Sequence, residues 1–542
     1  MSDHPIFTYQ TRIELTETQA GMLSAYAALY GQAERSLFAA MRAGGTANDL
    51  KRAFLPRFGL TARQFNAIRV GLDGKIVSIK ERRPELIAEA ETRIKRAGKV
   101  MPKLQARAPG SNRLHQKKRR LSTLRAHLAA MKSDHESGAV RLCFGSKRSF
   151  RAEVDLAANG YASHGEWKAH WRAARSSQFS ALGSGDETAG NQTCQARLEA
   201  DGSLTLCLRL PNGLAPSRKI MELPGVRFAY GHDAIVAALS SSRRIAAQTK
   251  AGKSIVKRTG AAISYRFLRD ERGWRVFASV EAQAVNPASR HELGAVGIDV
   301  NADHLAGAET DRFGNLVKAF RIALPLYGKT ADQAKALIGD ACVAMANCAQ
   351  AAGKPVVIEE LNFQKKKAGL EAVDPRQARM LSSFACNQVI AGLKAACFRA
   401  GVEVIKVNPA YASVIGAVNS AQPRGISVHQ GAALAIARRG LGFSERPTVR
   451  QAIVPARNGG HVTFDLPVRN RSRHVWSFWS AVRTKLKAAH AAHYRSGEAK
   501  AKPAPLISAT RSVCAHRSLP AKFRHANRDQ HCSDHVLDDI PW

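Results

Sequence analysis

The sequence predicts an α+β protein of several domains, and three observations point to this class. At 542 residues the chain is long enough for two to four domains with sizeable cores. Apolar residues recur at helical spacing before residue 137, whereas short runs in which apolar and polar residues alternate fill 138–290. From residue 291 onward, strand-like runs alternate with segments of helix length, which indicates an α/β arrangement.

The N-terminal part is predicted to hold one strand and then helices. The run IFTYQTRIE (6–14) alternates as a strand does. A helix is predicted over 15–45, with a capping box that begins at Thr16. Two more helices are predicted over 60–98, with a turn at Asp73-Gly74.

The next segment carries an unusual excess of positive charge. Residues 93–132 contain thirteen Lys or Arg and no acid, within a chain of formal net charge +39. A solvated helix face normally mixes both signs, so this run favours a helical clamp for an RNA or DNA backbone. Its densest part consists of Lys117, Lys118, Arg119 and Arg120.

Residues 138–290 are predicted to form a domain resembling a β-barrel. Alternating runs begin with AVRLCFG (139–145), and hairpin turns are expected at Asp201-Gly202 and Arg272-Gly273. Helical material is expected within this domain, at about 163–178.

Strands and helices then follow in a defined order. Three strands are expected within 294–321, and a strand leading to Glu359 comes after the next helix. The later elements are a long helix (376–401), a strand (403–408) and a helix (427–440). Three antiparallel strands followed by helices alternating with parallel strands is the order of RNase H-like folds.

Two acids end apolar runs of this region. Asp299 lies in GAVGIDVN (294–301) and Glu359 in PVVIEELNF (355–363). A carboxylate at the end of a buried strand costs several kcal/mol unless a partner offsets it. Such a pair suits a two-metal phosphoryl-transfer site, and caps or salt bridges are the alternative.

These motifs resemble a known family. GIDVN, IEELNF and the stretch SFACNQVIAGLKAACFRAGVEVIKVNPAYASVIG (383–416) resemble RuvC motifs of TnpB proteins and type V CRISPR effectors. The resemblance covers roughly 290–445 and extends weakly to the N-terminus. It implies a RuvC-type nuclease domain, a β-barrel wedge domain completed by the N-terminal strand, and a helical recognition domain.

The resemblance also implies a site for two Mg²⁺ ions. Asp299 would bridge the ions and Glu359 would hold one of them, whereas Glu360 should point to the opposite face. The family places a third Asp on the last helix, where SVHQGAALAIARRG (427–440) has His429 instead. Because imidazole suits Mg²⁺ less than a carboxylate does, Mn²⁺ is expected to support activity better.

Three interpretations of this departure stay open. In the first, His429 ligates or orients a metal, as RuvC-like folds accept His near this corner. In the second, one metal is lost and the protein binds without cutting. In the third, His429 is a bystander, and Asp303 or Asp465 supplies the charge.

Further basic residues are candidates for contact with nucleic acid, and the cysteines bear on whether a zinc site is expected. Arg438 and Arg439 are expected either to meet the nucleic-acid backbone or to face solvent. A basic loop should border the nucleic-acid channel; it consists of Lys365, Lys366 and Lys367. None of the nine cysteines forms a CxxC pair, and residues 416–428 hold no cysteine where relatives often carry a zinc ribbon, so no structural zinc is expected.

The function expected from the resemblance is that of an RNA-guided DNA endonuclease of an insertion sequence, with a guide RNA and double-stranded DNA as partners. The alternatives are a nuclease-impaired, repressor-like binder under RNA guidance, and a nucleic-acid-binding nuclease without a guide. The chain shows no apolar run of transmembrane length and no signal-peptide pattern, so a cytoplasmic protein without a membrane partner is expected. The expected domains are the first wedge strand (1–14), the helical recognition domain (15–137), the wedge domain (138–290), the nuclease domain (291–490) and a poorly ordered tail (491–542).

Overall fold

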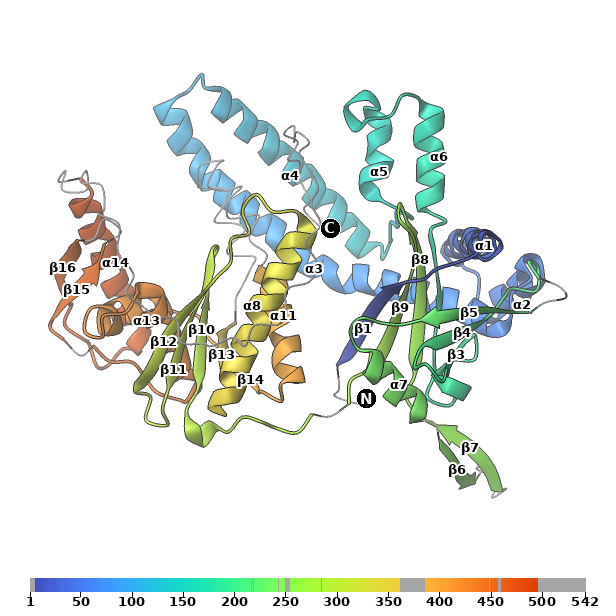
Figure 1. Ribbon diagram of the computed structural model, residues 1–542. Coiled ribbons are helices and arrows are strands. Elements are labelled where there is room, and N and C mark those ends of the chain that lie inside the picture. Colours follow the sequence, from blue (N-terminus) through green and yellow to red (C-terminus); the bar gives the residue numbers. More distant parts are fainter. Residues whose placement is uncertain are drawn as a thin grey trace, which may run out of the picture. The chain divides into compact units, whose positions relative to one another are not determined.

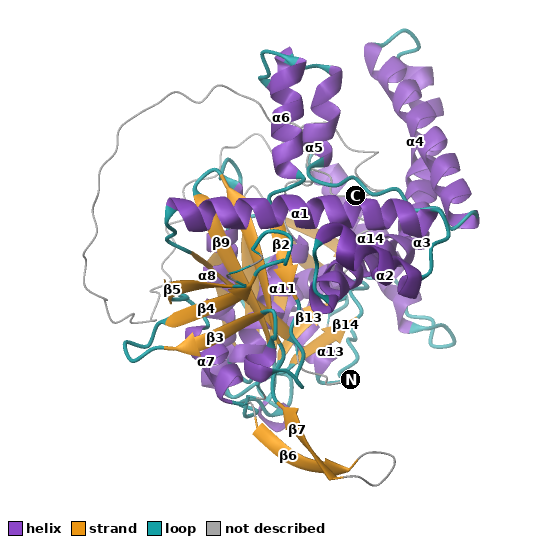
Figure 2. Ribbon diagram, turned by 90° about the vertical axis from the view of Figure 1, so that its right-hand side faces the viewer, coloured by secondary structure: helices purple, strands orange, loops and turns teal. Residues whose placement is uncertain are grey.

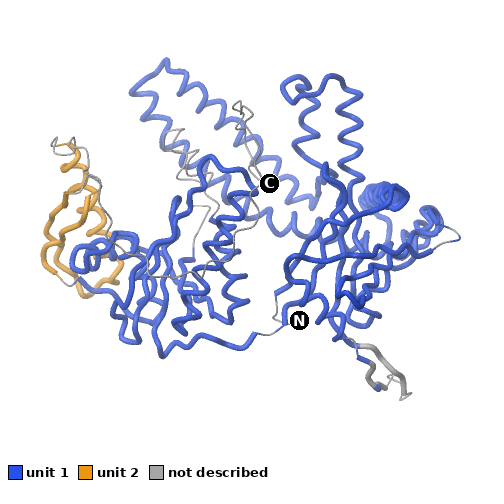
Figure 3. Tube along the Cα trace, viewed as in Figure 1, with its two compact units in different colours: residues 1–448 blue, residues 449–542 orange. Residues whose placement is uncertain are grey.

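The computed structural model forms two compact units, Met1–Thr448 and Val449–Trp542 (Figure 3). It describes residues 5–215, 217, 219–241, 243–248, 254–283, 285–360, 386–447, 449–456 and 460–495. The division at Val449 falls inside the range 291–490 that the sequence assigns to a single nuclease domain. No helix in the described ranges has both the length and the apolar character needed to span a membrane.

The N-terminal strand joins a sheet with strands that come much later in the chain. The order is β1-β9-β8-β2, with every neighbouring pair antiparallel. The four strands are β1 (Ile6–Arg12), β2 (Gln178–Ala181), β8 (Ile263–Asp270) and β9 (Gly273–Glu281). Asp270 pairs with Gly273, so the β8–β9 turn lies one residue earlier than the sequence predicts.

Two smaller antiparallel sheets complete this β-rich part. One has the order β3-β4-β5, from Cys194–Leu198, Leu204–Arg209 and Ile220–Val226. The other pairs β6 (Arg243–Gln248) with β7 (Ser254–Thr259). The predicted turn at Asp201-Gly202 does join β3 to β4. The strand predicted over 139–145 is not formed; this described segment has no regular secondary structure.

Helices pack with these sheets around one core. The helices are α1 (Glu17–Arg42), α2 (Ala47–Phe58), α3 (Ala62–Arg107), α4 (Asn112–Glu136), α5 (Lys147–Arg151), α6 (His164–Ala174) and α7 (His232–Ser240). Buried side chains of α1, α2, α3 and α7 share a cluster with those of the strands. Helices α5 and α6 stand side by side as a pair (Figures 1 and 2). The capping box predicted at Thr16 is present at the start of α1.

Helix α3 is a single 46-residue helix, so the prediction of two helices with a turn at Asp73-Gly74 is wrong. Ile68 and Leu72 are buried, and Ile76, four residues further on, packs against the same core. A continuous helix keeps these apolar groups on one face across the Asp-Gly pair. The Asp73 carboxylate pairs instead with Arg69 one turn back, at 3.0 Å.

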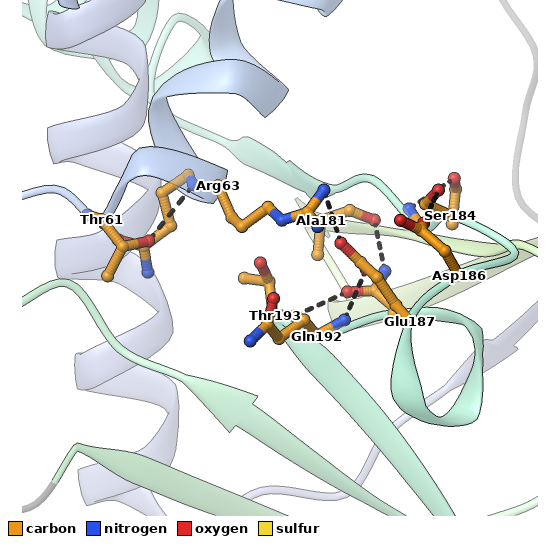
Figure 4. A network of polar contacts seen from close by, with 12 residues as sticks. Thr61, Arg63, Ala181, Ser184, Asp186, Glu187, Gln192 and Thr193 are labelled. Carbon is orange, nitrogen blue, oxygen red and sulfur yellow. Dashed lines mark hydrogen bonds and ion pairs between the residues drawn. The ribbon is translucent and has the colours of Figure 1, made fainter. Parts of the chain in front are cut away.

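Two buried polar contacts attach this long helix to its surroundings. Arg83 donates hydrogen bonds to the main-chain carbonyls of Asp134 and Ala139, at the end of α4, and the second measures 2.6 Å. At the start of the helix, Arg63 forms an ion pair of 2.7 Å with Glu187, whose side chain is almost completely buried (Figure 4). Glu187 also accepts the amide of Gln192 at 2.7 Å. The start of α3 is therefore tied to the loop between β2 and β3.

The second large sheet has the order β12-β11-β10-β13-β14. Its strands are β10 (Val296–Val300), β11 (His304–Thr310), β12 (Leu316–Ala323), β13 (Val356–Glu359) and β14 (Val404–Val407). The first three are mutually antiparallel, whereas β13 and β14 run parallel to β10. This confirms the predicted succession of three antiparallel strands and two parallel ones.

Helices cover both faces of this sheet. On one face, α8 (Ala331–Ala352) and α11 (Cys386–Arg399) share a cluster with Val296, Ile298 and Ile358. On the other face, α13 (Val428–Gly440) packs against Ala295 and Val357. Between them along the chain lie α12 (Ala412–Gly416) and a π-helical turn (Ala417–Ala421). Strand side chains alternate between the faces, so the face of any strand residue follows from this division.

Candidate active site

The two strand-end acids occupy equivalent positions on neighbouring parallel strands. Ile298 of β10 pairs with Ile358 of β13, and Asp299 and Glu359 follow them directly. Because side chains alternate, both acids point to the face that carries α13, the face of Val357. Glu360 follows on the opposite side and is exposed. The sheet thus brings together two acids that lie sixty residues apart in the chain.

Helix α13 lies in direct contact with the middle of β10. A Cβ atom added to Gly297 would lie 2.0 Å from the carbonyl oxygen of Ala433 and 2.6 Å from the amide nitrogen of Ala437. Only a glycine therefore allows this approach. The helix begins with a capping box in which Ser427 and Gln430 satisfy each other's backbone amides. This box sets where the first turn starts, and with it the position of His429.

His429 lies against Asp299. Its Nδ1 is 3.1 Å from Asp299 Oδ2, within hydrogen-bond distance. The Asp299 residue is only 7% exposed, whereas half of the His429 side chain is open to solvent. Asn301 Nδ2 donates a second hydrogen bond to the same carboxylate oxygen, at 3.0 Å. The buried carboxylate thus has two partners within the protein, which offset much of its desolvation cost.

A second histidine, which the sequence analysis missed, borders the same site. The His304 and His429 rings meet edge to face with centroids 5.0 Å apart. His304 is 7% exposed, and its Nδ1 lies 2.7 Å from Asp303 Oδ1. Asp299 of β10 pairs with Ala306 of β11, and His304 lies two residues before Ala306, so both point to the same face of the sheet. The strand alternation of HLAGAET could therefore have placed His304 on the Asp299 face.

Both alternative acids already have partners within the protein. Asp303 is bound to His304 and to Arg321, the latter at 3.1 Å. The hydrogen bond with His304, aided by Arg321, lowers the pKa of Asp303. Asp465 belongs to the second compact unit, where its carboxylate accepts a hydrogen bond from Gln451.

The side chains of Asp299, Glu359 and His429 are of types that bind a divalent metal, but they are not arranged around a common point. Two carboxylates and an imidazole are ligands that Mn²⁺ or, less well, Mg²⁺ accepts. Within the described ranges, however, no three His, Cys, Asp or Glu side chains are clustered so that they could hold an ion. The hydrogen bond between His429 Nδ1 and Asp299 Oδ2 leaves Nε2 of the imidazole and Oδ1 of the carboxylate as the atoms that could meet a metal.

Arg438 and Arg439 are engaged within the protein. Arg438 donates to Glu445 Oε1 at 2.5 Å and to the carbonyl of Gly314 at 2.7 Å. Arg439 donates to the carbonyls of Asn408 and Ala410, the latter at 3.0 Å. Both guanidinium groups hold loops beside the sheet, and their contact with a nucleic-acid backbone stays a prediction.

Arg439 also bears on the acidic site. Burial lowers the pKa of Arg439, and the Glu359 and Glu445 carboxylates oppose that effect. The positive charge of Arg439 is therefore felt at Glu359, and it counters part of the negative charge that would attract a cation there.

The basic run lies on α4. Leu114 and Leu121 are buried and hold this helix against α3. Lys118, Arg119 and Arg120 are exposed, whereas Lys117 is half-buried. The predicted basic loop of Lys365, Lys366 and Lys367, like the tail beyond residue 495, lies outside the described residues.

Comparisons with known proteins give distant similarities. No protein-family model matches the sequence, and no curated protein matches it either. Among solved structures, the chain is similar to T. thermophilus RuvC in complex with a Holliday junction substrate. That similarity has 17% identity and a TM-score of 0.20, over 27% of this chain and 90% of RuvC. It is also similar to a chain of a CRISPR-Cas12f ternary complex, with 12% identity and a TM-score of 0.18, over 82% of this chain and all of that one.

Proposed function

We propose that this chain is an RNA-guided DNA endonuclease with an RNase H-like domain of RuvC type. The observation that carries the proposal is the register of β10 and β13, which gives Asp299 and Glu359 equivalent positions on neighbouring strands, with Asp299 against His429 of α13. The sheet order β12-β11-β10-β13-β14 supports the same fold. The net charge of +39 supports a polyanionic partner.

Each site residue has a distinct part in this proposal. Asp299, Glu359 and His429 would hold Mg²⁺ or Mn²⁺, with His304 packed behind the His429 ring. Two such ions, when bound, would activate the attacking water and stabilise the leaving 3′ oxygen. The chain's own contribution is to fix the two carboxylates on rigid strands and to aim His429 from a capped helix end.

A cleavage assay tests the active site. Protein purified with its RNA should cut plasmid DNA that matches that RNA, and Asp299→Ala or Glu359→Gln should abolish cutting while binding persists. Glu360→Gln is the matched control, because Glu360 neighbours Glu359 but faces away from the site. A Glu359→Gln protein that cuts as fast as the Glu360→Gln protein would show that the site is misassigned.

A second function, RNA-guided binding without cutting, is favoured by one specific observation. The Asp299 carboxylate is already bonded to His429, and no described group of three ligands is clustered for a metal. The same assay in Mg²⁺ and in Mn²⁺ separates the two functions. A binder leaves plasmid intact with either ion, and His429→Asp can then restore cutting. A nuclease that uses His429 loses activity in His429→Ala.

The role of the guide is tested separately. RNase treatment before the assay should remove target selection if a guide directs the protein. Unchanged cutting of unrelated plasmids after this treatment would identify a nuclease without a guide. Sequencing of the co-purifying RNA then shows whether one defined species is bound.

A further inference from the structure

The second compact unit contains two strands and a helix in the order ββα. It contains β15 (Gln451–Pro455), β16 (His461–Asp465) and α14 (Val475–His493) (Figure 3). The strands form an antiparallel hairpin, and α14 packs against β16. Phe478, Trp479 and Val482 of the helix are buried.

The charge of this unit is strongly one-sided. Residues 449–495 contain nine arginines and lysines but a single acid, Asp465. The carboxylate of Asp465 accepts a hydrogen bond from Gln451, and no described Arg or Lys of this unit forms an ion pair with that carboxylate. Nine basic residues against one acid in this stretch favour a polyanion as partner.

An exposed tryptophan lies at the start of α14, in contrast to its buried neighbour. Trp476 is 38% exposed, whereas Trp479 is 1% exposed. His474 caps the helix by accepting the Trp476 amide at 3.2 Å, and its ring meets the indole edge to face at 5.1 Å. The capping contact and the ring contact hold the indole in place at the surface.

The loop that leads into this helix carries exposed arginines three and five residues before Trp476. Asn470 Oδ1 accepts the amide and the hydroxyl of Ser472, at 2.9 and 2.6 Å, which fixes a turn. Arg471 and Arg473, on either side of Ser472, are exposed. The N-terminal end of a 19-residue helix adds a partial positive charge at the same place.

We propose that Arg471, Arg473 and Trp476 form a binding site for single-stranded nucleic acid. The arginines would hold successive phosphates, and an unpaired base would stack on the indole. Base stacking on an aromatic side chain combined with a basic track is how proteins bind single strands without reading sequence. The site uses none of the residues proposed for cleavage, and it does not depend on the chain being a nuclease.

Tryptophan fluorescence of the full-length protein gives a local readout of this site. A base stacked on Trp476 should quench a component of the emission that is missing in Trp476→Phe. Oligo(dT), oligo(U) and a blunt duplex of equal length are the probes. A response to either single strand supports the site and identifies DNA or RNA as its source. An equally large response to the duplex, or identical quenching of the native and Trp476→Phe proteins, overturns it.

Affinity measurements separate this site from diffuse attraction. Trp476→Ala should weaken binding of the responding oligonucleotide by about 5- to 150-fold, the range expected for one stacked base. The double variant Arg471→Ala/Arg473→Ala should weaken it more than the charge-matched control Arg483→Ala/Lys487→Ala, which alters exposed positions along α14. Equal losses in the two double variants would show general electrostatic attraction and refute a local site. Unchanged melting temperatures show that each variant is folded.

Discussion

Substituting Gly297 by alanine tests the contact that holds α13 on β10. The added Cβ would lie 2.0 Å from the carbonyl oxygen of Ala433, whereas Cβ atoms essentially never come closer than 3.0 Å to another atom. The helix must therefore move by about 1 Å or more, since both groups in the clash are backbone or Cβ atoms. His429 moves with the helix, and Asp299 stays on the strand.

Two magnitudes follow. Forcing extra volume into a packed site costs about 1–3 kcal/mol. That cost should raise the hydrogen-exchange rates of α13 amides by about 5- to 150-fold if exchange proceeds by opening of this helix. A shift of about 1 Å in a catalytic group lowers activity by about 100-fold. Any cleavage activity should therefore fall steeply even where the protein stays folded.

Hydrogen exchange measured by mass spectrometry reads this effect at the helix itself. Gly339→Ala is the matched control, because Gly339 lies within α8 and an added Cβ there meets nothing within 4 Å. That change should stabilise α8 by about 0.5–1 kcal/mol through the helix preference of alanine. If Gly297→Ala leaves the exchange of α13 as slow as in the native protein, the inferred close packing is wrong.

Three further predictions concern other parts of the molecule. Arg63→Ala should lower the free energy of unfolding by about 1–3 kcal/mol, because it leaves the buried Glu187 without a counter-charge. Arg69→Ala should lower it by less than about 0.5 kcal/mol, since the Arg69–Asp73 ion pair is exposed. Urea denaturation of the two variants compares these costs. Burial raises the pKa of Cys342 to about 11 and of Cys397 to about 12. The stability that the two buried thiols contribute is therefore complete below the unfolded pKa of about 9 and is lost as the pH rises toward the folded-state pKa values. Thermal melts between pH 8 and 11 measure this loss. Charge reversal of the run 117–120 should lower the slope of log affinity for RNA against log salt by roughly 0.7–0.9 for each lost phosphate contact, and an unchanged slope would show that the run is a solvated face.

The strands of the candidate site could be predicted because their signals are local. Apolar runs that end in one acid indicate buried strands, and β10 and β13 hold Asp299 and Glu359 where the sequence placed them. The Ser427 box likewise fixes the start of α13 through neighbours in the chain. These features depend on residues within a few positions of one another.

The features that were missed depend on contacts distant in sequence. Asp73-Gly74 suggests a turn by composition, but the packing of Ile68 and Leu72 on a remote core keeps α3 continuous. The adjacency of His304 and His429 arises from strand pairing and helix docking, which no local pattern encodes. The engagement of Arg439 by loop carbonyls after β14 is of the same kind.

The contact between Asp299 and His429 shows what a histidine at the start of α13 does for the buried acid. A second carboxylate at the start of α13 would place like charges together on a buried face, an arrangement that needs a cation to be stable. With histidine at this position, Asp299 instead receives a hydrogen bond from within the protein, and Asn301 supplies another. The imidazole can donate to the carboxylate or, as a neutral ring, offer its nitrogen to a metal, but one nitrogen cannot do both at once. The second ring nitrogen, Nε2, can bind a metal while Nδ1 donates to Asp299, so this contact is compatible with either proposed function.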